Sequence, residues 1–456
     1  MKKLTNLSVN LVQKILPDSF IFCIILAIVV FIVALPVTGL GVIAIVNAFG
    51  SSVWGLLSFS MQMALVVVLG TAFATAPPIK KLIIKLAGIP KNAVTAVVFV
   101  TLVTAICDFI NWGFGLVIGA LLAKEVAKKL KNVDYPLLIA ASYSAFAVWH
   151  AGLSGSIPLS ITTLTDGVVA NTGGYLTETV SVSDTILSAW NIIMVIIVVV
   201  VLMIMNALMC PKGDDITVID PSLLVDEPEV ERKKGGHVNE RLENSYILTY
   251  IIVAICAVYI IYYFATSGDI LNALTLNIVN LIFLTLGMAF HKTPIGYVRA
   301  ISDAASGAAG VILQFPFYAG IQGMMVVQNE AGVSVATTIS NFFVNISTQR
   351  TFPVFCYLAA GIVNFFVPSG GGQWAVQGPI MMPAGGELGV SPAVTCMAIA
   401  WGDAWTNLLQ PFWALPALGI AGLGIKDIMG YCVIDLIAVG IVTALCFLII
   451  VPAFTL

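Results

Sequence analysis

Charged residues are scarce in this sequence, and their scarcity excludes an ordinary soluble protein. Only 9% of the 456 residues are Asp, Glu, Lys or Arg, whereas about 25% is usual in soluble domains. Hydrophobic residues make up 59% of the chain, and many lie in long apolar runs such as 20–35, 191–205 and 436–451. A single globular core cannot bury so many apolar residues, so lipid must be their solvent. The composition therefore predicts an all-α polytopic membrane protein in a lipid bilayer.

Motifs of several enzyme and pump classes are also missing. None of the 8 cysteines belongs to a C-x-x-C pair, so neither a disulfide framework nor a zinc site is expected. The sequence has no G-x-x-x-x-G-K-S/T run, which an ATP-driven pump would need. The 3 histidines, His150, His237 and His291, are too scattered to indicate a metal centre. We therefore expect no enzymatic activity, no cofactor, no firmly bound metal and no nucleic-acid partner.

The 20 Lys and Arg residues indicate which loops are cytoplasmic, because such loops are enriched in these residues. They form clusters at 2–14, 80–91, 124–131, 212–241 and 292–299, and two lie alone at Arg350 and Lys426. Spans at 16–38 and 52–76 leave the first two clusters, and hence the N-terminus, in the cytoplasm. The N-terminal segment lacks a signal-peptide cleavage site, so we interpret 16–38 as a span that stays in place.

Two apolar stretches must begin and end on the same side of the membrane, yet each is too short to form two complete spans. The stretch 94–123 is flanked by basic loops on both sides, yet two complete spans would need about 20 residues each. We therefore expect a re-entrant helical hairpin that enters from the cytoplasm, with its polar tip at 107–115 buried in protein or next to water. The stretch 353–384, polar at 367–374, is expected to form a second hairpin that enters from the opposite face.

Each hairpin is followed by an expected span that is interrupted at membrane depth. In 135–164 the interruption is the segment 150–158, which contains two glycines, two serines and a proline. In 392–424 it is the segment 402–411. Such interruptions free backbone groups that need partners inside the membrane. Both segments are therefore expected to be broken helices.

The two halves of the sequence repeat one order of elements. Residues 1–209 and 246–456 both follow the order span, span, hairpin, interrupted helix and span, and the extra helix 246–265 reverses the second half. Residues 210–245, with 5 basic and 9 acidic residues, are interpreted as a cytoplasmic linker. This order predicts an inverted-topology repeat with about nine full spans and two re-entrant hairpins. The remaining full spans are expected at 185–209, 272–291, 300–327 and 431–453.

An inverted repeat of this kind is typical of secondary transporters, which bind substrate near the membrane midplane between the broken elements. No Lys or Arg is expected in the membrane core, so a bound carboxylate would be held by backbone N–H groups, hydroxyls and amides. The alternative interpretation is that these small residues only allow close helix packing. The candidate substrate-binding residues are Asn111, Gly113, Gly115, Ser154, Gly155, Ser156, Ser369, Gly370, Gly371, Gly372, Gln373, Asn407 and Gln410.

Ionisable residues inside the membrane are candidates for coupling transport to a cation. Asp108 lies at a hairpin tip and Asp403 at a helix break, where each could carry a proton or bind a cation, or else cap local backbone N–H groups. His150 adjoins the first break and could titrate or serve as a hydrogen-bonded structural residue. Asp303 and Asp435 lie near span ends, where interface or packing roles are expected. The coupling ion is H⁺ or Na⁺, with Na⁺ possible at the hairpin tips.

Aromatic residues gather at the same elements and could line a pocket for a short apolar tail, although packing at the lipid interface is the usual role of such residues. They are Trp112, Phe114, Trp149, Trp374, Trp405, Phe412 and Trp413. A small amphiphilic anion is therefore the expected substrate. The architecture favours a carrier over an anion channel, whose filter could also use glycine-rich loops, and a membrane enzyme is the third alternative.

Seven blocks of the sequence resemble the bacterial short-chain fatty acid transporter family, whose members include acetoacetate and butyrate uptake proteins. The blocks are 110–127, 134–146, 152–159, 291–302, 312–325, 364–379 and 410–432. The resemblance implies cation-coupled uptake of a short monocarboxylate across the cytoplasmic (inner) membrane; a carrier for another small organic anion is the alternative. A relation to the ion-transporter superfamily would further imply an elevator-type movement and a homodimer. His150 departs from the family pattern, which makes it a candidate for a local difference in coupling or specificity.

Overall fold

The computed structural model describes residues 19–162, 164, 166–213, 216–220, 236–268, 273, 275–365 and 370–455. Within these ranges the chain forms helices and turns and no β-strand. Six of the described helices are long and apolar enough to cross a membrane, and the bent pair α4 (Leu57–Ala74) and α5 (Pro77–Leu86) brings the number to seven if it counts as one span. The all-α polytopic architecture that the composition predicts is confirmed at this level.

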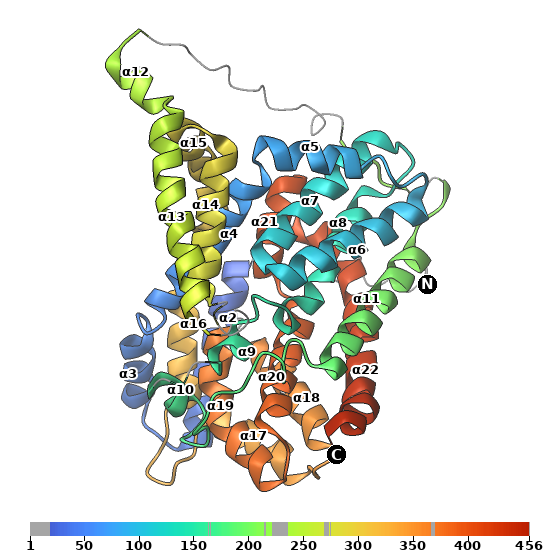
Figure 1. Cartoon of the computed structure of the whole chain (residues 1–456). Helices are drawn as coiled ribbons and strands as arrows, with labels where there is room; N and C mark the ends of the chain where they lie inside the picture. The colour runs from blue at the N-terminus through green and yellow to red at the C-terminus, as the bar shows by residue number, and fades with distance from the viewer. Residues whose placement is uncertain are drawn as a thin grey trace.

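The first half contains the elements up to the linker, as Figure 1 shows in blue to green. Besides α4 and α5, they are α2 (Ser19–Thr38), α3 (Val42–Ser52), α6 (Ala93–Ile110), α7 (Trp112–Lys129), α8 (Tyr135–Ser144), the 3-10 helix η1 (Ala145–Ala151), α9 (Ser156–Ser160), α10 (Asp166–Asn171) and α11 (Ala189–Met209). The expected hairpin stretch 94–123 thus contains the α6–α7 junction. The interruption expected within 135–164 corresponds to η1 and the turn before α9.

The second half follows in yellow to red (Figure 1). Its elements are α12 (Val238–Glu243), α13 (Tyr246–Thr266), α14 (Leu276–His291), α15 (Pro294–Ala305), η4 (Ser306–Ala308), α16 (Ala309–Val326), α17 (Val335–Asn345), α18 (Phe352–Asn364), α19 (Gly370–Glu387), α20 (Pro392–Asn407), α21 (Pro411–Ala421) and α22 (Ile425–Thr455). The stretch 353–384 is divided between α18 and α19. Residues 408–410 separate α20 from α21, inside the interruption expected at 402–411.

Short helices that were not expected include α3 and α17. After α2, Gly39 adopts a positive φ of 67°, which glycine tolerates without strain, and the chain turns into α3 before α4 begins at Leu57. In the second half, α17 begins with a capping box between Ser334 and Thr337. Each of these helices has only 11 residues, about half the length of a span, so hydropathy alone does not distinguish them from loops.

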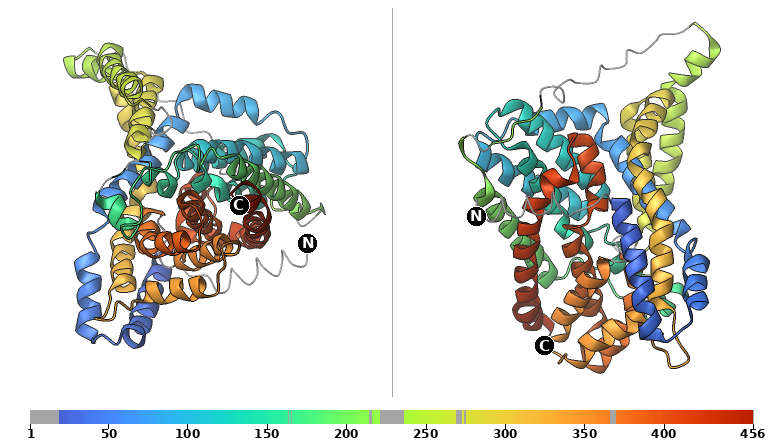
Figure 2. Two further views of the ribbon diagram at one scale, coloured as in Figure 1. Left: turned by 60° about the horizontal axis from the view of Figure 1, so that its bottom comes forward. Right: turned by 180° about the vertical axis from the view of Figure 1, so that it is seen from behind.

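The helices form two groups that lie side by side (Figures 1 and 2). In the first, which we call the peripheral group, α16 packs on α2 and α3, and α14 and α15 pack on α4, with α13 outside them. In the second, the central group, α6, α7 and α8 pack on one another and α18 packs on α20. The broken helix Tyr135–Ser160 lies inside the central group, and 94% of its most apolar 18-residue stretch is buried. The contacts of α21 and α22 with α8 join the two halves of the sequence.

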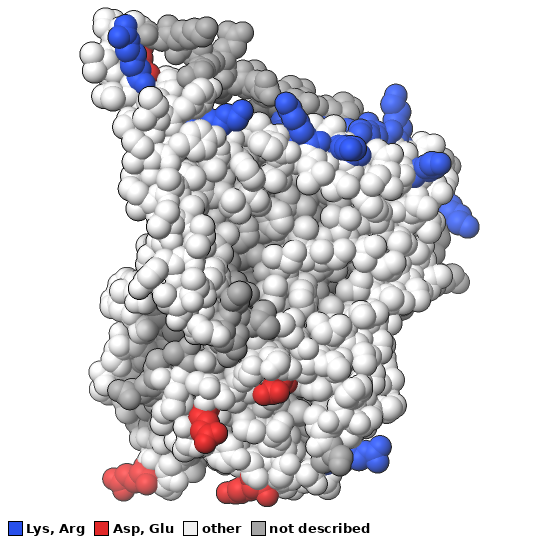
Figure 3. Space-filling view, in the orientation of Figure 1, with Lys and Arg blue, Asp and Glu red and all other residues white. Residues whose placement is uncertain are grey.

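Charged side chains separate to the two ends of the molecule. Figure 3 shows Lys and Arg concentrated at the end where α5, α12 and α15 lie, whereas the opposite end carries mostly acidic side chains. This asymmetry follows from the sequence, because most basic residues of the clusters at 80–91, 124–131 and 292–299 lie on α5, in the last turns of α7 and on α15 or next to it. The assignment of that end, and of the N-terminus, to the cytoplasm stays a prediction.

The start of the linker is bound to the central group at the basic end. The carboxylate of Asp134, which caps α8, accepts hydrogen bonds from the N–H groups of Leu137 at 2.8 Å and Thr217 at 2.9 Å. The N–H of Tyr135 donates in return to the carbonyl of Thr217. Burial raises the pKa of Asp134, and these hydrogen bonds act in the opposite direction. Residues 214–215 and 221–235 of the expected linker lie outside the described residues.

Gly402 determines how closely α18 and α20 approach. A Cβ atom at this position would meet the Ala360 methyl group at 2.5 Å and the Gly361 nitrogen at 3.1 Å, and it would also overlap the Tyr357 carbonyl oxygen. Because the obstructing atoms include backbone, the overlap cannot be relieved by rotating one side chain. The two helices would have to separate.

We therefore expect Gly402→Ala to destabilise the protein by about 1–3 kcal/mol, the usual cost of overpacking a close contact. The measurement is the thermal unfolding midpoint of purified protein in detergent. Gly419→Ala on α21 is the matched control, because a Cβ atom there would meet nothing within 4 Å. Equal midpoints for the two variants would contradict the proposed role of Gly402.

Candidate functional site

A single residue, Asn111, connects α6 to α7. Its backbone is extended, with φ −156° and ψ 121°, and its side-chain oxygen accepts a hydrogen bond from the N–H of Phe114 at 2.9 Å. Asn111 is thus the N-cap of α7, a role that favours asparagine. The Nδ2 atom of the same side chain is buried and has no hydrogen-bond partner among the described residues. The oxygen of this side chain therefore fixes the helix start, and its nitrogen is a candidate ligand contact.

The break after η1 docks on this junction. The Ser154 hydroxyl accepts a hydrogen bond from the N–H of Trp112 at 3.0 Å, and the N–H of Leu153 donates to the Phe109 carbonyl at 2.6 Å. A Cβ atom on Gly152 would overlap the backbone of Phe109, so this approach requires glycine. The backbone groups that the two interruptions free inside the membrane thereby satisfy one another, as burial in lipid demands.

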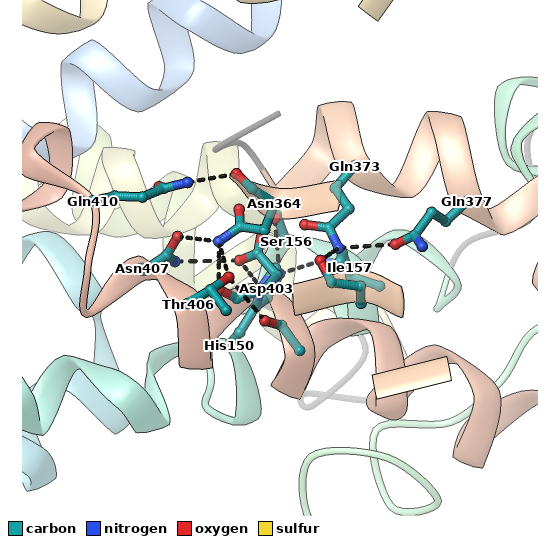
Figure 4. A network of polar contacts seen from close by, with 12 residues as sticks. His150, Ser156, Ile157, Asn364, Gln373, Gln377, Asp403, Thr406, Asn407 and Gln410 are labelled. Atoms are coloured by element: carbon teal, nitrogen blue, oxygen red, sulfur yellow. Dashed lines mark hydrogen bonds and ion pairs between the residues drawn. The ribbon is translucent and has the colours of Figure 1, made fainter. Parts of the chain in front are cut away.

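A matching arrangement is formed at the second junction by Asn364, the last residue of α18. Its Nδ2 atom donates to the Asp403 carbonyl at 2.8 Å, the Thr406 hydroxyl at 2.7 Å and the Asn407 side-chain oxygen at 2.8 Å. The Asn364 carbonyl accepts a hydrogen bond from the side chain of Gln410. Figure 4 shows these contacts around the end of α20. One asparagine therefore binds the final turn of α20 and the connection to α21.

The two halves meet at a buried pair formed by His150 of η1 and Asp403 of α20. Their Nδ1 and Oδ2 atoms are 2.8 Å apart, and both side chains are 0% exposed. On the far side of the imidazole ring, Nε2 lies 3.1 Å from the Ser156 hydroxyl and accepts a hydrogen bond from the N–H of Ile157, also at 3.1 Å (Figure 4). Gly370, at the start of α19, packs so closely that a Cβ atom would overlap the ring. Helices α9, α19 and α20 therefore converge on His150 of η1.

Aromatic rings cover one side of this convergence. The Trp149 ring stacks on His150 with centroids 3.9 Å apart and planes at 14°. Trp112 lies edge to face against both Trp149 and Trp413, at 6.0 and 5.1 Å. Two of the other expected aromatic residues pack elsewhere: Phe114 against Phe73 and Phe283, and Trp405 on Tyr357. The cluster of Trp112, Phe146, Trp149 and Trp413 therefore lies directly beside the pair, with Trp149 in contact with His150.

Several buried polar atoms around the two junctions have no hydrogen-bond partner among the described residues. Native proteins leave few such atoms unpaired, so these atoms are candidates for contacts with ions, water or substrate. The acceptors are Asp403 Oδ1, Asn364 Oδ1, Gln373 Oε1, Gln410 Oε1 and both carboxyl oxygens of Asp108; the donors are Asn111 Nδ2, Gln377 Nε2 and the indole N–H groups of Trp112, Trp149 and Trp374. Among the described residues, no group of three or more His, Cys, Asp or Glu side chains could hold a metal ion.

The structure brings most of the expected site residues to the two junctions. Asn111 and Ser154 meet at the first, Asn407 and Gln410 at the second, and Ser156, Gly370, His150 and Asp403 lie between them. Gly371, Gly372 and Gln373 form the first turn of α19, where the Gln373 side chain donates to the Ala360 carbonyl and to Gln377. Ser369 lies outside the described residues.

Other expected residues lie in close helix contacts. Gly113 packs on Val66 of α4, and Gly115 packs directly on the Asp108 carboxyl group. Gly155 packs on the His150 carbonyl and Pro158. These positions match the packing interpretation of small residues in membranes. The binding role of the glycines stays a prediction.

Two residues that the sequence analysis missed take part in this network. Asn364 follows an Ile-Val pair just as Asp108 follows Ile-Cys, and a phenylalanine comes next in both halves; this internal match was the available signal. Asn191 begins a strongly apolar run, and its side chain donates to the Ala151 carbonyl at 3.0 Å and accepts from the Trp401 indole N–H at 2.9 Å. A polar residue that opens such a run inside the membrane was the signal there.

Comparison with known proteins finds similar chains along the whole length. The family model described as short chain fatty acid transporter matches residues 1–450. The "Putative short-chain fatty acid transporter" of Escherichia coli (strain K12) is 42% identical over 442 residues, covering 96% of this chain and 98% of that protein. The protein of the same name from Haemophilus influenzae is 42% identical over 445 residues, covering 96% and 97%. The crystal structure of the Alcanivorax borkumensis YdaH transporter, 15% identical, has the same fold at a TM-score of 0.54, over 96% of this chain and 99% of that one.

We expect Asn364→Ala to destabilise the protein by about 1–3 kcal/mol, because the variant leaves buried acceptors of α20 without a donor. Thermal unfolding in detergent measures this loss. Asn345→Ala at the exposed end of α17 is the matched control and should leave the midpoint unchanged. An equal shift in both variants, or in neither, would show that Asn364 does not fasten the end of α20.

Proposed function

Because this chain belongs to the short-chain fatty acid transporter family, we propose that it is a cation-coupled carrier that imports a short monocarboxylate of the acetate, butyrate or acetoacetate class. The protein is a membrane-spanning transporter and not an enzyme, because the family and the relatives that it matches are transporters. The observation that carries the mechanistic part of the proposal is the meeting of two broken helices, one from each half, at His150 and Asp403. The bacterial cytoplasmic membrane is the proposed location.

The proposed architecture is an inverted repeat of residues 1–209 and 246–456. In it, α6–α7 and α18–α19 are two re-entrant hairpins that enter from opposite faces, among about nine full spans. The order of the elements supports this: in both halves a helix pair with a polar junction precedes a broken helix. The equivalent places of Asp108 and Asn364 near the ends of α6 and α18 give further support.

A carboxylate can be bound here without a Lys or Arg side chain. Helices α7 and α19 both begin at the junctions, and the helix dipole attracts anions to a helix N-terminus. At the first junction, Asn111 Nδ2 and the indole N–H of Trp112 are buried donors without a partner among the described residues. The aromatic cluster beside them offers an apolar surface to a short alkyl chain. A small anion with a short apolar tail fits both features.

Coupling to a cation gives the first functional prediction. In proteoliposomes without an H⁺ or Na⁺ gradient, labelled substrate should reach the same concentration inside as outside and should not accumulate further. An inward gradient of H⁺ or of Na⁺, imposed separately, should drive accumulation above the external concentration. Protein-free liposomes are the necessary control, because undissociated short-chain acids cross lipid unaided. Equilibration that neither gradient changes would contradict coupled transport, and conductance in single-channel recordings would favour a channel.

Asn111→Asp tests the carboxylate site. Aspartate caps helices as well as asparagine does, so α7 should remain intact while a negative charge replaces a candidate anion-binding amide. Repulsion of like charges in a buried site should lower substrate affinity at least about tenfold. Uptake kinetics at pH 7 measure the change in KM. Asn92→Asp, an exposed asparagine that caps α6 in the same way, is the matched control and should behave as the unmodified protein. Equal KM values in the two variants would exclude Asn111 from the binding site.

A further inference from the structure

The hydrogen bonds around His150 determine where its proton lies. The backbone N–H of Ile157 is a donor, so the Nε2 atom that faces it must carry a lone pair. The single proton of the neutral ring is therefore on Nδ1, which donates to Asp403 Oδ2 at 2.8 Å. A doubly protonated ring would place an N–H group against the N–H of Ile157. In this packing His150 is neutral and does not compensate a negative charge on Asp403.

Asp403 lacks the partners that an ionised carboxylate needs. Its Oδ2 atom accepts from His150 and, at 3.4 Å, from the side chain of Asn407, whereas its Oδ1 atom is buried and has no hydrogen-bond partner among the described residues. An uncompensated buried charge is strongly unfavourable, and proteins neutralise or pair it. Protonation of Oδ1 removes the charge and leaves both hydrogen bonds to Oδ2 in place.

Among the described residues, no other ionisable side chain forms an ion pair with Asp403. The ionisable residues on the helices packed around η1 and α20 are Cys107, Asp108, Lys124, Glu125, Lys128, Lys129, Tyr135, Tyr143, Cys356, Tyr357, Glu387, Cys396, Asp403, Lys426, Asp427, Tyr431, Cys432, Asp435 and Cys446. Of these, Asp403 is the one with a hydrogen bond to the imidazole among the described residues. The lysines of α7 lie in its last turns, at the basic end of the molecule, and Lys426 lies at the start of α22.

We propose that Asp403 is the residue that binds the coupling proton, and that His150 is the positioning residue that holds its carboxyl group. This inference rests on the proposed function and specifies its coupling ion. A proton from water on one side of the membrane binds Oδ1, forming an O–H bond, and leaves to water on the other side. One substrate anion and one proton then cross together, and the transport cycle moves no net charge.

The position of the pair explains how the proton and the substrate are linked. The Asp403 carbonyl is bound by Asn364 at the second junction, and the His150 ring packs against Gly370 at the start of α19. The neighbouring Ser154 binds the first junction. The starts of α7 and α19, the proposed carboxylate-binding helix ends, therefore contact His150 or the break that follows it. A negative charge on Asp403 would repel a substrate anion bound there. Protonation of Asp403 removes that repulsion.

Asp403→Asn is the decisive variant, because asparagine has the shape of a protonated aspartate and still accepts a hydrogen bond from His150. In proteoliposomes it should exchange labelled for unlabelled substrate within about threefold of the unmodified rate. It should lose the accumulation driven by an inward proton gradient, which for one proton per anion is about tenfold per pH unit. Asp435→Asn, another fully buried aspartate, is the matched control and should keep proton-driven accumulation.

The outcomes separate this inference from the proposed function. Absence of carrier-mediated exchange in the unmodified protein would contradict the proposed function itself. Normal exchange with proton-driven accumulation retained in Asp403→Asn, or lost in Asp435→Asn instead, would overturn the assignment of Asp403. Accumulation that follows a Na⁺ gradient at constant pH, and that Asp403→Asn abolishes, would show that Oδ1 holds Na⁺ and not the proton.

The role of His150 is tested by two amides of different reach. The amide group of Asn overlaps the Nδ1 position, so His150→Asn can keep the donor to Asp403, whereas His150→Gln reaches the Nε2 position and loses that donor. A donor to a carboxylate favours its charged form, so its loss should move the midpoint of proton-driven uptake to higher pH, by about one unit. The pH profile of initial uptake measures this. Identical profiles for His150→Gln and the unmodified protein would exclude the positioning role.

Discussion

The rest of this structure depends on one constraint, which is that a helix interrupted inside lipid must find partners for its freed backbone groups. Each backbone N–H or carbonyl that an interruption frees needs a partner, because hydrocarbon supplies none and an unpaired group costs several kcal/mol. The chain satisfies the groups at each interruption with the end of another broken element. The break after η1 is bound to the α6–α7 junction through Ser154 and Phe109, and the end of α20 is bound to α18 through Asn364. Broken elements therefore occur as facing pairs, and the polar site lies where these pairs meet.

The same constraint explains what the sequence could predict. Polar residues and glycines are so costly within apolar runs that they mark where a helix ends, and the segments 107–115 and 402–411 do contain the α6–α7 junction and the α20–α21 turn. The positions of the expected breaks could thus be deduced to within a few residues. The repeat of one order of elements in the two halves, deduced from the Lys and Arg clusters, stays a prediction. Entry of the two hairpins from opposite faces stays a prediction, since it depends on the placement of a bilayer.

Contacts across the molecule could not be predicted in this way. His150 and Asp403 are 253 positions apart, and each seemed a separate candidate because local patterns carry no information about which distant residue faces a side chain. Asn364 was missed for a related reason: a single amide at the end of an apolar helix is conspicuous only when compared with Asp108 in the other half. The short helices α3 and α17 lacked the length that gives a hydropathy signal.

The distribution of close contacts bears on how the site could move. Both members of the His150–Asp403 pair belong to the central group, and so do the junctions bound to them, so hydrogen bonds hold the entire polar site within one set of helices. Where α4 of the peripheral group meets α7, Gly70 lies against the backbone of Phe114 and Gly113 lies against Val66. The Phe114 ring also packs against Phe73 of α4 and Phe283 of α14, so this contact combines close backbone approach with aromatic packing. A movement of the central group against the peripheral group would therefore carry the site across the membrane with its hydrogen bonds intact. A movement between the two halves of the sequence would have to break the buried pair on every cycle.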